Sequence, residues 1–303
     1  LERLPAALRA MDQPSMDGVN SYVVSEAVHA AGLKVALSGL GGDELFGGYP
    51  SFRRQARMGP WGGAGKWAGA VAAGLRGGLH LRDVRWEKLV DLLGAGGEPE
   101  AVYGVSRRML PPDDVAALLG GPGGGTSKPA TLPADPINAI SYLEITRYMR
   151  NTLLRDCDVM SMAHSLEVRV PFVDVNVCRY AMSIPGSWKL ADGRPKGFLL
   201  DALGPRLPEY VWNRKKMGFT LPFAHWMRGR FRPAIERVFA DGPLLRRCGL
   251  DPATASRIWR DFDADPERWG VAVCSVDGQR LAIGDVDIHH SIRSEEHTSE
   301  LQS

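Results

Sequence analysis

One segment constrains the fold of this chain more than any other. LKVALS, at 33–38, is a short apolar run bounded by glycine, and the loop SGLGGDE follows at 38–44. Such a run is typical of a buried, parallel strand. A helix is predicted before it, from Pro14 to Gly32, and another after it, from Glu44 to Met58. Helix, strand, glycine-rich loop and helix form half of a doubly wound α/β unit, in which ligands bind at the carboxyl ends of strands.

The rest of the chain is predicted to be mostly helical. The pattern of apolar residues and breakers indicates helices at 84–94, 98–109, 112–119, 137–165 and 174–183. VRVPFVD is expected to be extended and to end at Pro171, and the glycine- and proline-rich stretch 120–136 is typical of a linker. Residues 59–78 give no clear pattern.

Composition excludes several classes of protein. With 44% hydrophobic residues in 303, the chain is not disordered as a whole, and it has no apolar run long enough to span a membrane. Four cysteines lack metal-ligand or redox spacing, which favours reduced thiols and a cytoplasmic location. The formal charge of +2 argues against bulk binding of nucleic acid.

The last eleven residues, RSEEHTSELQS at 293–303, are polar and aperiodic. They resemble a translated sequencing adapter and are expected to be a non-native tail. They carry one Arg and three Glu, which leaves 36 basic and 32 acidic side chains in 1–292, a charge of +4. A charge of this size fits local attraction for a nucleotide, and it does not indicate bulk binding of nucleic acid.

The loop after the predicted strand is the first candidate site. Glycine at 39, 41 and 42 allows positive φ and close approach of the backbone, so that the N–H groups can converge on an anion. Asp43 stands where a carboxylate could hold Mg²⁺ against a polyphosphate. The alternative is a tight strand-to-helix turn in which Asp43 caps the helix.

Two later segments place charges among apolar residues. In 146–174, acidic and basic side chains such as Glu167 and Arg169 are interpreted mainly as a structural ion-pair network, because buried charges need partners. In 194–226, Lys196 and the basic run RKK ending at Lys216 stand beside glycines and aromatics. They form either a solvated basic face or a site where lysine binds phosphate.

Together, KVALSGLGGDELFGGY, LLRDCDVMSMAHSLEVRVPFVD and RKKMGF followed by LPFAHW resemble, in order and spacing, the synthetase domain of the glutamine-hydrolysing asparagine synthetases. The resemblance covers about Asp12 to Trp226. It implies a helix-rich α/β fold of the adenine-nucleotide α-hydrolase (ATP-pyrophosphatase) type, with a parallel sheet truncated at its N-terminal side and a mostly helical C-terminal part.

The resemblance also implies the chemistry. ATP activates a carboxylate, aspartate in the parent family, as an acyl-adenylate with release of pyrophosphate, and ammonia from a glutaminase domain then attacks the acyl carbon. Asp43 matches the residue linked to Mg²⁺, Lys216 the lysine that stabilises pyrophosphate, and Lys196 a helper. The nucleotide loop is matched by Ser38, Gly39, Gly41 and Gly42.

The expected partners follow from this resemblance. They are aspartate, ATP, glutamine-derived ammonia and the N-terminal glutaminase domain of the same parent chain, with a homodimer as a further expectation and neither nucleic acid nor membrane. The family's SGGxDS phosphate loop and the glutaminase's catalytic Cys do not occur in 1–303. Residues 1–292 are therefore expected to be the C-terminal portion of a longer synthetase.

One departure leaves the substrate open. Leu40 occupies a position that is Glu in plain asparagine synthetases and Tyr in the related β-lactam synthetases. Leucine supplies neither a proton acceptor nor a hydrogen bond. Either another acid serves, with Glu144 as the candidate, or the acceptor differs from aspartate, as in the synthetase-like enzymes of biosynthetic clusters. A catalytically inactive scaffold is the third hypothesis, because the phosphate loop is missing from 1–303.

Overall fold

The computed structural model describes residues 2–15, 17–58, 67, 71, 74, 84–121, 131–190, 193–212, 221–264, 270–274 and 280–284. The first half comprises α1 (Leu4–Ala10), α2 (Asp17–Ala30), β1 (Val35–Leu37), α3 (Gly42–Phe46), α4 (Pro50–Met58), α6 (Val84–Gly94), α7 (Pro99–Arg107), α8 (Pro112–Leu119) and α9 (Pro136–Leu143). A π-helical segment (Glu144–Leu153), α10 (Leu154–Met162), β2 (Glu167–Arg169) and a 3₁₀ turn (Pro171–Val173) follow.

The second half is mostly helical in its described residues. It comprises α11 (Val175–Ser183), α12 (Gly186–Lys189), α13 (Gly197–Leu203), a 3₁₀ turn (Gly204–Arg206), α14 (Glu209–Trp212), α15 (Phe223–Arg228), α16 (Arg232–Ala240), α17 (Gly242–Arg247) and α18 (Pro252–Ala264), and the antiparallel pair β3 (Gly270–Cys274) and β4 (Arg280–Gly284). The expected helix-rich α/β composition with a small parallel sheet is confirmed.

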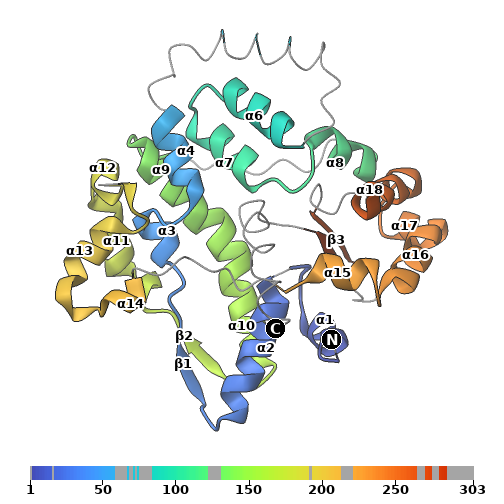
Figure 1. Ribbon diagram of the computed structural model, residues 1–303, viewed down its shortest axis with the longest axis horizontal. Coiled ribbons are helices and arrows are strands. Elements are labelled where there is room, and N and C mark those ends of the chain that lie inside the picture. The colour runs from blue at the N-terminus through green and yellow to red at the C-terminus, as the bar shows by residue number, and fades with distance from the viewer. Residues whose placement is uncertain are drawn as a thin grey trace, which may run out of the picture.

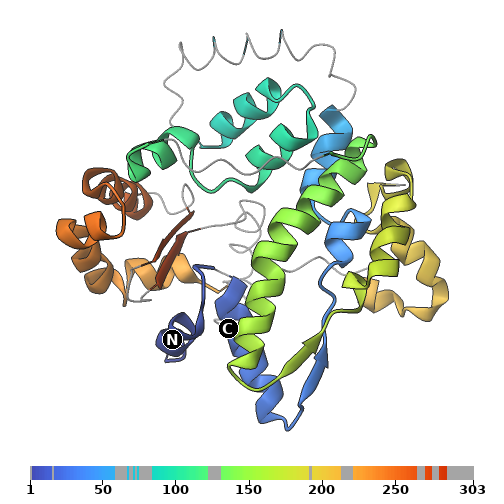
Figure 2. The same cartoon turned by 180° about the vertical axis from the view of Figure 1, so that it is seen from behind.

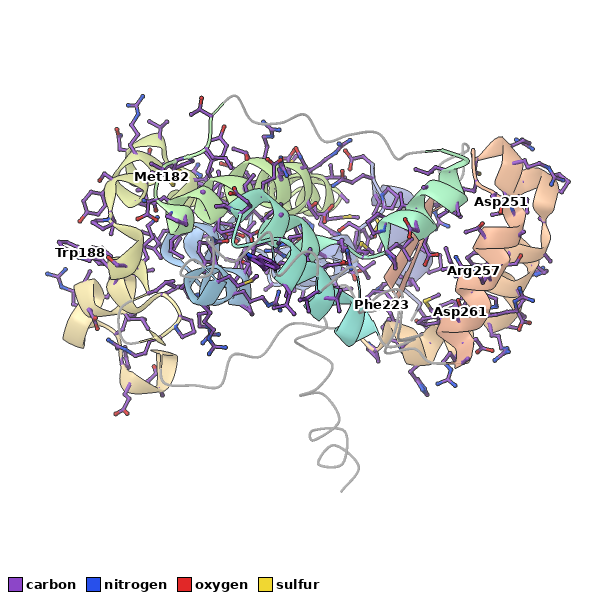
Figure 3. The ribbon with its side chains drawn as sticks, turned by 90° about the horizontal axis from the view of Figure 1, so that it is seen from above. Met182, Trp188, Phe223, Asp251, Arg257 and Asp261 are labelled. Carbon is purple, nitrogen blue, oxygen red and sulfur yellow. The ribbon has the colours of Figure 1, made fainter. Side chains whose placement is uncertain are left out.

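A long helical rod runs through the centre of the molecule, made of α9, the π-helical segment and α10 (Figures 1 and 2). Helix α2 lies against α10, and the buried side chains of Met11, Val19 and Met160 pack between them and α1. Helices α11 to α14 flank the rod on one side and α15 to α18 on the other, with α6 to α8 across the top of Figure 1. From above, Trp188 and Arg257 lie at opposite ends of the molecule (Figure 3).

The start of the rod is set by local sequence. Asp135 caps α9, because its Oδ1 accepts from the backbone N–H groups of Ile137 at 2.8 Å and Asn138 at 3.0 Å. Pro136 fits the first helical turn, where its missing N–H would have no partner. Helix was correctly predicted over 137–165, but the π-helical stretch within it was not.

The parallel pairing of β1 with β2 is the centre of the predicted α/β unit. Val35 pairs with Glu167 and Leu37 with Arg169, which confirms the parallel strand. The expectation that this strand is buried is wrong among the described residues, because Val35 is 44% and Leu37 75% exposed. Within the described residues this sheet has only two strands, β1 and β2. Parallel sheets are normally covered by helices on both faces.

The helix predicted from Glu44 to Met58 is two helices. Gly47 adopts φ +73°, a left-handed conformation that ends α3, and Pro50 begins α4. The other helices expected up to residue 119 and over 174–183 are confirmed within a few residues. Residues 122–130 of the expected linker and most of 59–83 lie outside the described residues.

Within the described ranges, none of the helices is long and apolar enough to cross a membrane. The thiols of Cys157, Cys178 and Cys248 are free, as expected, and the side chain of Cys274 lies outside the described part.

A buried lysine is the least expected feature of the packing. Lys189 at the end of α12 is 0% exposed, and among the described residues its Nζ has no hydrogen-bond partner. Burial lowers the pKa of this amine to about 8, although the nearby Asp135 carboxylate opposes the shift. In the unfolded chain this amine keeps its proton up to its ordinary pKa of 10.5, whereas in the folded protein it loses the proton near pH 8. The buried lysine therefore destabilises the fold fully below pH 8, and this destabilisation is lost as the pH rises from about 8 to 10.5.

We therefore expect Lys189→Met to raise the free energy of unfolding by about 2–3 kcal/mol at pH 7, since each unit of pKa shift corresponds to about 1.4 kcal/mol. The gain should shrink toward zero at pH 10. Urea unfolding of both proteins at the two pH values measures this. A gain that is equal at pH 7 and pH 10 would show that side-chain packing, rather than the buried charge, is responsible.

Candidate active site

The glycine-rich loop begins at the carboxyl end of β1. The N–H of Ser38 donates to the carbonyl oxygen of Arg169 at 2.8 Å, which extends the parallel pairing to the first residue of the loop. The loop then passes beside the 3₁₀ turn that follows β2. It therefore lies at the carboxyl ends of both strands, where open α/β sheets place their ligands.

Gly41 has a structural reason to be glycine. Its φ is +94°, and a Cβ there would lie 3.0 Å from the Cβ of Phe172 and 3.3 Å from Cγ2 of Val173. At Gly42 a Cβ would make ordinary contacts with the Phe172 ring, and at Gly39 it would meet nothing within 4 Å. The three glycines thus differ: only Gly41 combines a left-handed backbone with close packing.

The N–H groups of the loop already have partners inside it. Leu40 donates to Ser38 Oγ at 3.3 Å, Gly41 to Glu44 Oε2 at 3.1 Å, and Gly42 to the carbonyl oxygen of Gly39 at 3.2 Å. These bonds are longer than the usual 2.9–3.0 Å and are correspondingly weak. An anion binding to Gly41 or Gly42 would have to compete with them, so anion binding by these amides stays a prediction.

Asp43 and Lys196, two of the predicted site residues, lie together. Lys196 Nζ is 3.2 Å from Asp43 Oδ1, and their side chains are 34% and 25% exposed. Lys196 has φ +57° just before α13, a conformation that few residues other than glycine adopt. Gly48 makes room for the Asp43 carboxylate, because a Cβ at that position would lie 1.7 Å from Asp43 Oδ1.

The chemistry of Asp43 suits a Mg–polyphosphate complex. Mg²⁺ in such complexes takes one or two protein carboxylates, and phosphate oxygens and water supply its other ligands. Asp43 is a partly exposed carboxylate beside a cation that could meet phosphate. The described residues contain no cluster of three or more His, Cys, Asp or Glu able to hold a metal ion without such a ligand.

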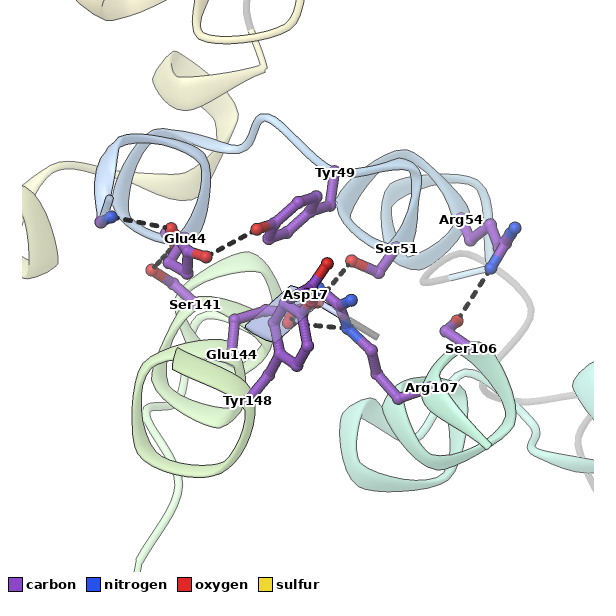
Figure 4. Close-up of polar contacts among 11 residues, drawn as sticks. Asp17, Glu44, Tyr49, Ser51, Arg54, Ser106, Arg107, Ser141, Glu144 and Tyr148 are labelled. Atoms are coloured by element: carbon purple, nitrogen blue, oxygen red, sulfur yellow. Dashed lines mark hydrogen bonds and ion pairs between the residues drawn. The ribbon is translucent and has the colours of Figure 1, made fainter. Parts of the chain in front are cut away.

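Glu144, the candidate acid, is fully buried at the start of the π-helical segment. Its Oε1 accepts from Ser51 Oγ at 2.8 Å, and its Oε2 accepts from Arg107 Nη2 at 2.6 Å and Nε at 2.9 Å (Figure 4). Burial raises the pKa of Glu144, while the Arg107 guanidinium and the Ser51 hydroxyl lower it. The pKa remains above its ordinary value.

A second buried carboxylate, Glu44, connects this acid to the loop. Tyr49 donates its hydroxyl to Glu44 Oε1 at 2.6 Å, and Ser141, one turn before Glu144 on the rod, donates to the carbonyl oxygen of Glu44 at 2.6 Å. Figure 4 shows Glu44 and Glu144 on neighbouring elements, with Tyr49 reaching toward Glu44 and Arg107 reaching toward Glu144. Burial raises the pKa of the Tyr49 phenol and Glu44 raises it further, so the hydroxyl remains a donor.

Arg107, Tyr49 and Glu44 were not assigned to the site from sequence. Arg107 ends α7, in a region with little resemblance to the family, and Glu44 was interpreted only as the start of a helix. A buried arginine cannot be distinguished from a solvated one by helical spacing alone. The sequence therefore carried no signal for this network beyond the nearness of Tyr49 to the loop.

Other predicted charges lie elsewhere. Glu167 and Arg169 pair with each other at 2.8 Å, but both side chains are more than half exposed, so the expected buried network does not extend to them. Lys216 lies in 213–220, outside the described residues, and its role stays a prediction.

Comparisons with known proteins bear on this site. The family described as asparagine synthase matches residues 1–285. Asparagine synthetase [glutamine-hydrolyzing] 1 of Bacillus subtilis is 30% identical over 256 residues, which cover 80% of this chain and 39% of that protein. No solved structure gives a significant match.

Two other relatives match a similar share of this chain. A putative asparagine synthetase [glutamine-hydrolyzing] of Mycobacterium bovis is 30% identical over 74% of this chain and 35% of its own length. Amidase chry2 of Gibberella zeae is 25% identical over 74% of this chain and 37% of its own length. The chain thus spans less than two fifths of the length of each relative named. The family match over nearly its whole length shows that this chain belongs to the asparagine synthase family.

Proposed function

We propose that this chain is part of an ATP-dependent ligase that converts a carboxylate, with aspartate as the first candidate, into an amide with glutamine-derived ammonia. One observation carries the proposal: in a chain of the asparagine synthase family, a glycine-rich loop at the carboxyl end of a parallel strand places Asp43 beside Lys196. A partly exposed carboxylate beside a lysine at this position suits the binding of a metal–polyphosphate complex.

The proposed reaction has two bond exchanges. A carboxylate oxygen of the substrate attacks the α-phosphorus of ATP, an acyl–phosphate bond forms, and the bond to the leaving pyrophosphate breaks. Ammonia then attacks the acyl carbon, loses a proton and displaces AMP. Pre-positioned charges lower the barrier of the first step because they stabilise the departing pyrophosphate.

Residues of this chain take defined roles in that scheme. Lys196 offers its amine to phosphate oxygens, and Lys216 is the predicted cation for the leaving pyrophosphate. Asp43 would hold Mg²⁺, which neutralises polyphosphate charge when bound. Glu144 stays the predicted acceptor for the proton that ammonia releases.

We further propose that residues 1–292 are the C-terminal portion of a longer synthetase, and that 293–303 are not native. The exposed apolar side chains of β1 support this, because further parallel strands bring helices that cover the faces of a sheet. The reading frame extended upstream is expected to encode an SGGxDS loop and a glutaminase domain. Sequencing the parent locus tests this proposal. A natural gene that begins at Leu1 would contradict it.

A related ligase with another acceptor is the second candidate. Leu40 replaces the family's glutamate, and relatives include a protein named amidase at 25% identity. The test is pyrophosphate release by the full-length protein with a panel of amino acids and other carboxylates. Release with aspartate alone supports the first candidate, and release with a different carboxylate alone supports the second. The absence of release with every carboxylate would reject both and leave the scaffold hypothesis.

We expect Asp43→Asn in the full-length protein to lower pyrophosphate release at least about 100-fold, the usual loss when one electrostatic contact to a developing charge is removed. Asparagine has nearly the same shape, so the close packing against Gly48 is kept. The matched control is Asp12→Asn, which removes a surface ion pair with Arg155 and should change the rate less than twofold. Near-wild-type release by Asp43→Asn would remove Asp43 from the site.

A further inference from the structure

Arg107 occupies an unusual position for an arginine at the end of a helix. Its guanidinium carbon lies over two tyrosine rings, 3.8 Å from the centroid of Tyr148 and 4.5 Å from that of Tyr49. In the same position it donates two hydrogen bonds to Glu144 Oε2. The side chain is therefore held by a carboxylate and by two aromatic rings, a combination that a guanidinium accommodates better than an ammonium does.

The contacts of Arg107 continue to the loop. The hydroxyl of Tyr49 binds Glu44 Oε1 at 2.6 Å, and Glu44 Oε2 accepts the N–H of Gly41 at 3.1 Å. Each step is a direct contact between buried or half-buried groups. One arginine thus touches the predicted acid directly and the loop backbone through two intervening side chains.

The second ring extends the contacts in another direction. Tyr148 donates its hydroxyl to Asp17 Oδ2 at 2.8 Å, which connects Arg107 to α2, the helix that precedes β1. Through these side chains the guanidinium of α7 is connected to α2, α4 and the rod (Figure 4).

The apolar packing of α7 does not depend on this arrangement. Helix α7 already packs on α4 and α9 through the apolar side chains of Tyr103, Phe52 and Ile140. A buried ion pair gains little net stability, because desolvation offsets the attraction, and an apolar pair of similar volume does as well. What the contacts of Glu144 add is orientation, because Arg107 donates twice to Oε2 and Ser51 donates to Oε1, so both carboxylate oxygens are held.

We propose that Arg107 is a positioning residue for the ATP-dependent reaction, which sets the orientation of the Glu144 carboxylate and, through Tyr49 and Glu44, the position of the Gly41 amide in the loop. This inference rests on the proposed function of the site. Arg107 itself touches neither the loop nor, on these contacts, a substrate.

The charge of Arg107 has a second consequence for Glu144. The groups that face this carboxylate are Arg107 and Tyr103 from α7, Ser51 from α4 and Glu44 from α3. Arg107 is the cation among these groups, and Glu44 opposes ionisation of its neighbour. Without the guanidinium, Glu144 would remain buried beside a second carboxylate, so its pKa would rise further.

The test compares variants in the full-length protein by pyrophosphate release across pH 5.5–9. Arg107→Met removes the charge and the fork, and Arg107→Lys keeps the charge without the planar contacts. Tyr49→Phe keeps the ring beside Arg107 but removes the hydroxyl that holds Glu44. The matched control is Arg108→Met, which removes the neighbouring arginine of α7's end and its ion pair with Asp91.

We expect Arg107→Met to lower kcat at least tenfold with a smaller change in KM for ATP, and to move the acid limb of the pH profile upward by at least one pH unit. Arg107→Lys should have its acid limb at the same pH as the wild type. Its kcat should lie between those of Arg107→Met and the wild type. Tyr49→Phe should lower kcat with the acid limb unmoved, because Arg107 still faces Glu144. Arg108→Met should match the wild type in both.

The outcomes separate the two proposals. A wild-type protein that releases no pyrophosphate overturns the proposed function and this inference with it. An active wild type with an unchanged acid limb in both Arg107 variants overturns the role of Arg107 alone, and so does a shift of equal size in Arg108→Met. If Arg107→Met fails to fold, as judged by circular dichroism, Arg107→Lys and Tyr49→Phe serve as the test. Rates and pH profiles equal to those of the wild type in both variants reject the proposal.

Discussion

The parallel pairing of β1 with β2 joins segments about 130 residues apart and determines most of what surrounds the candidate site. Each strand follows a helix, α2 or α10, and these two helices pack against each other through Val19 and Met160. Because parallel strands end at the same edge, the loop after β1 is brought against the turn after β2. The contact of Gly41 with Phe172 is the direct result of this pairing.

Around that loop the structure holds two carboxylates out of solvent. Glu44 and Glu144 are 1% and 0% exposed, and buried charges of one sign persist only where donors and a cation satisfy them. Tyr49, Ser51 and Arg107 meet this need from three places in the chain. Burial by itself lowers the pKa of Arg107, but Glu144 together with Tyr148 and Tyr49 more than reverses the effect, so the guanidinium stays charged. The side chains of this polar centre therefore hold one another in place.

The elements predicted correctly from sequence are those with strong local signals. The proline and glycine boundaries defined α7, α8 and the start of the rod, and the apolar run at 33–38 identified β1. The predictions failed where a non-local or conformational factor decided. Gly47 adopts a left-handed backbone that splits one expected helix, and the burial expected for β1 depended on neighbours that the described residues do not supply.

The sequence by itself determined the family, the strand–loop–helix unit and the chemical types at Asp43 and Lys196, because motif order, periodicity and breaker residues are written locally in the chain. The tertiary structure alone decided that Lys196 faces Asp43, that Glu144 is sealed from solvent, and that Arg107 joins it to the loop. The physical reason is that side chains distant in sequence meet only when helices pack, and only packing excludes the water that would otherwise screen their charges.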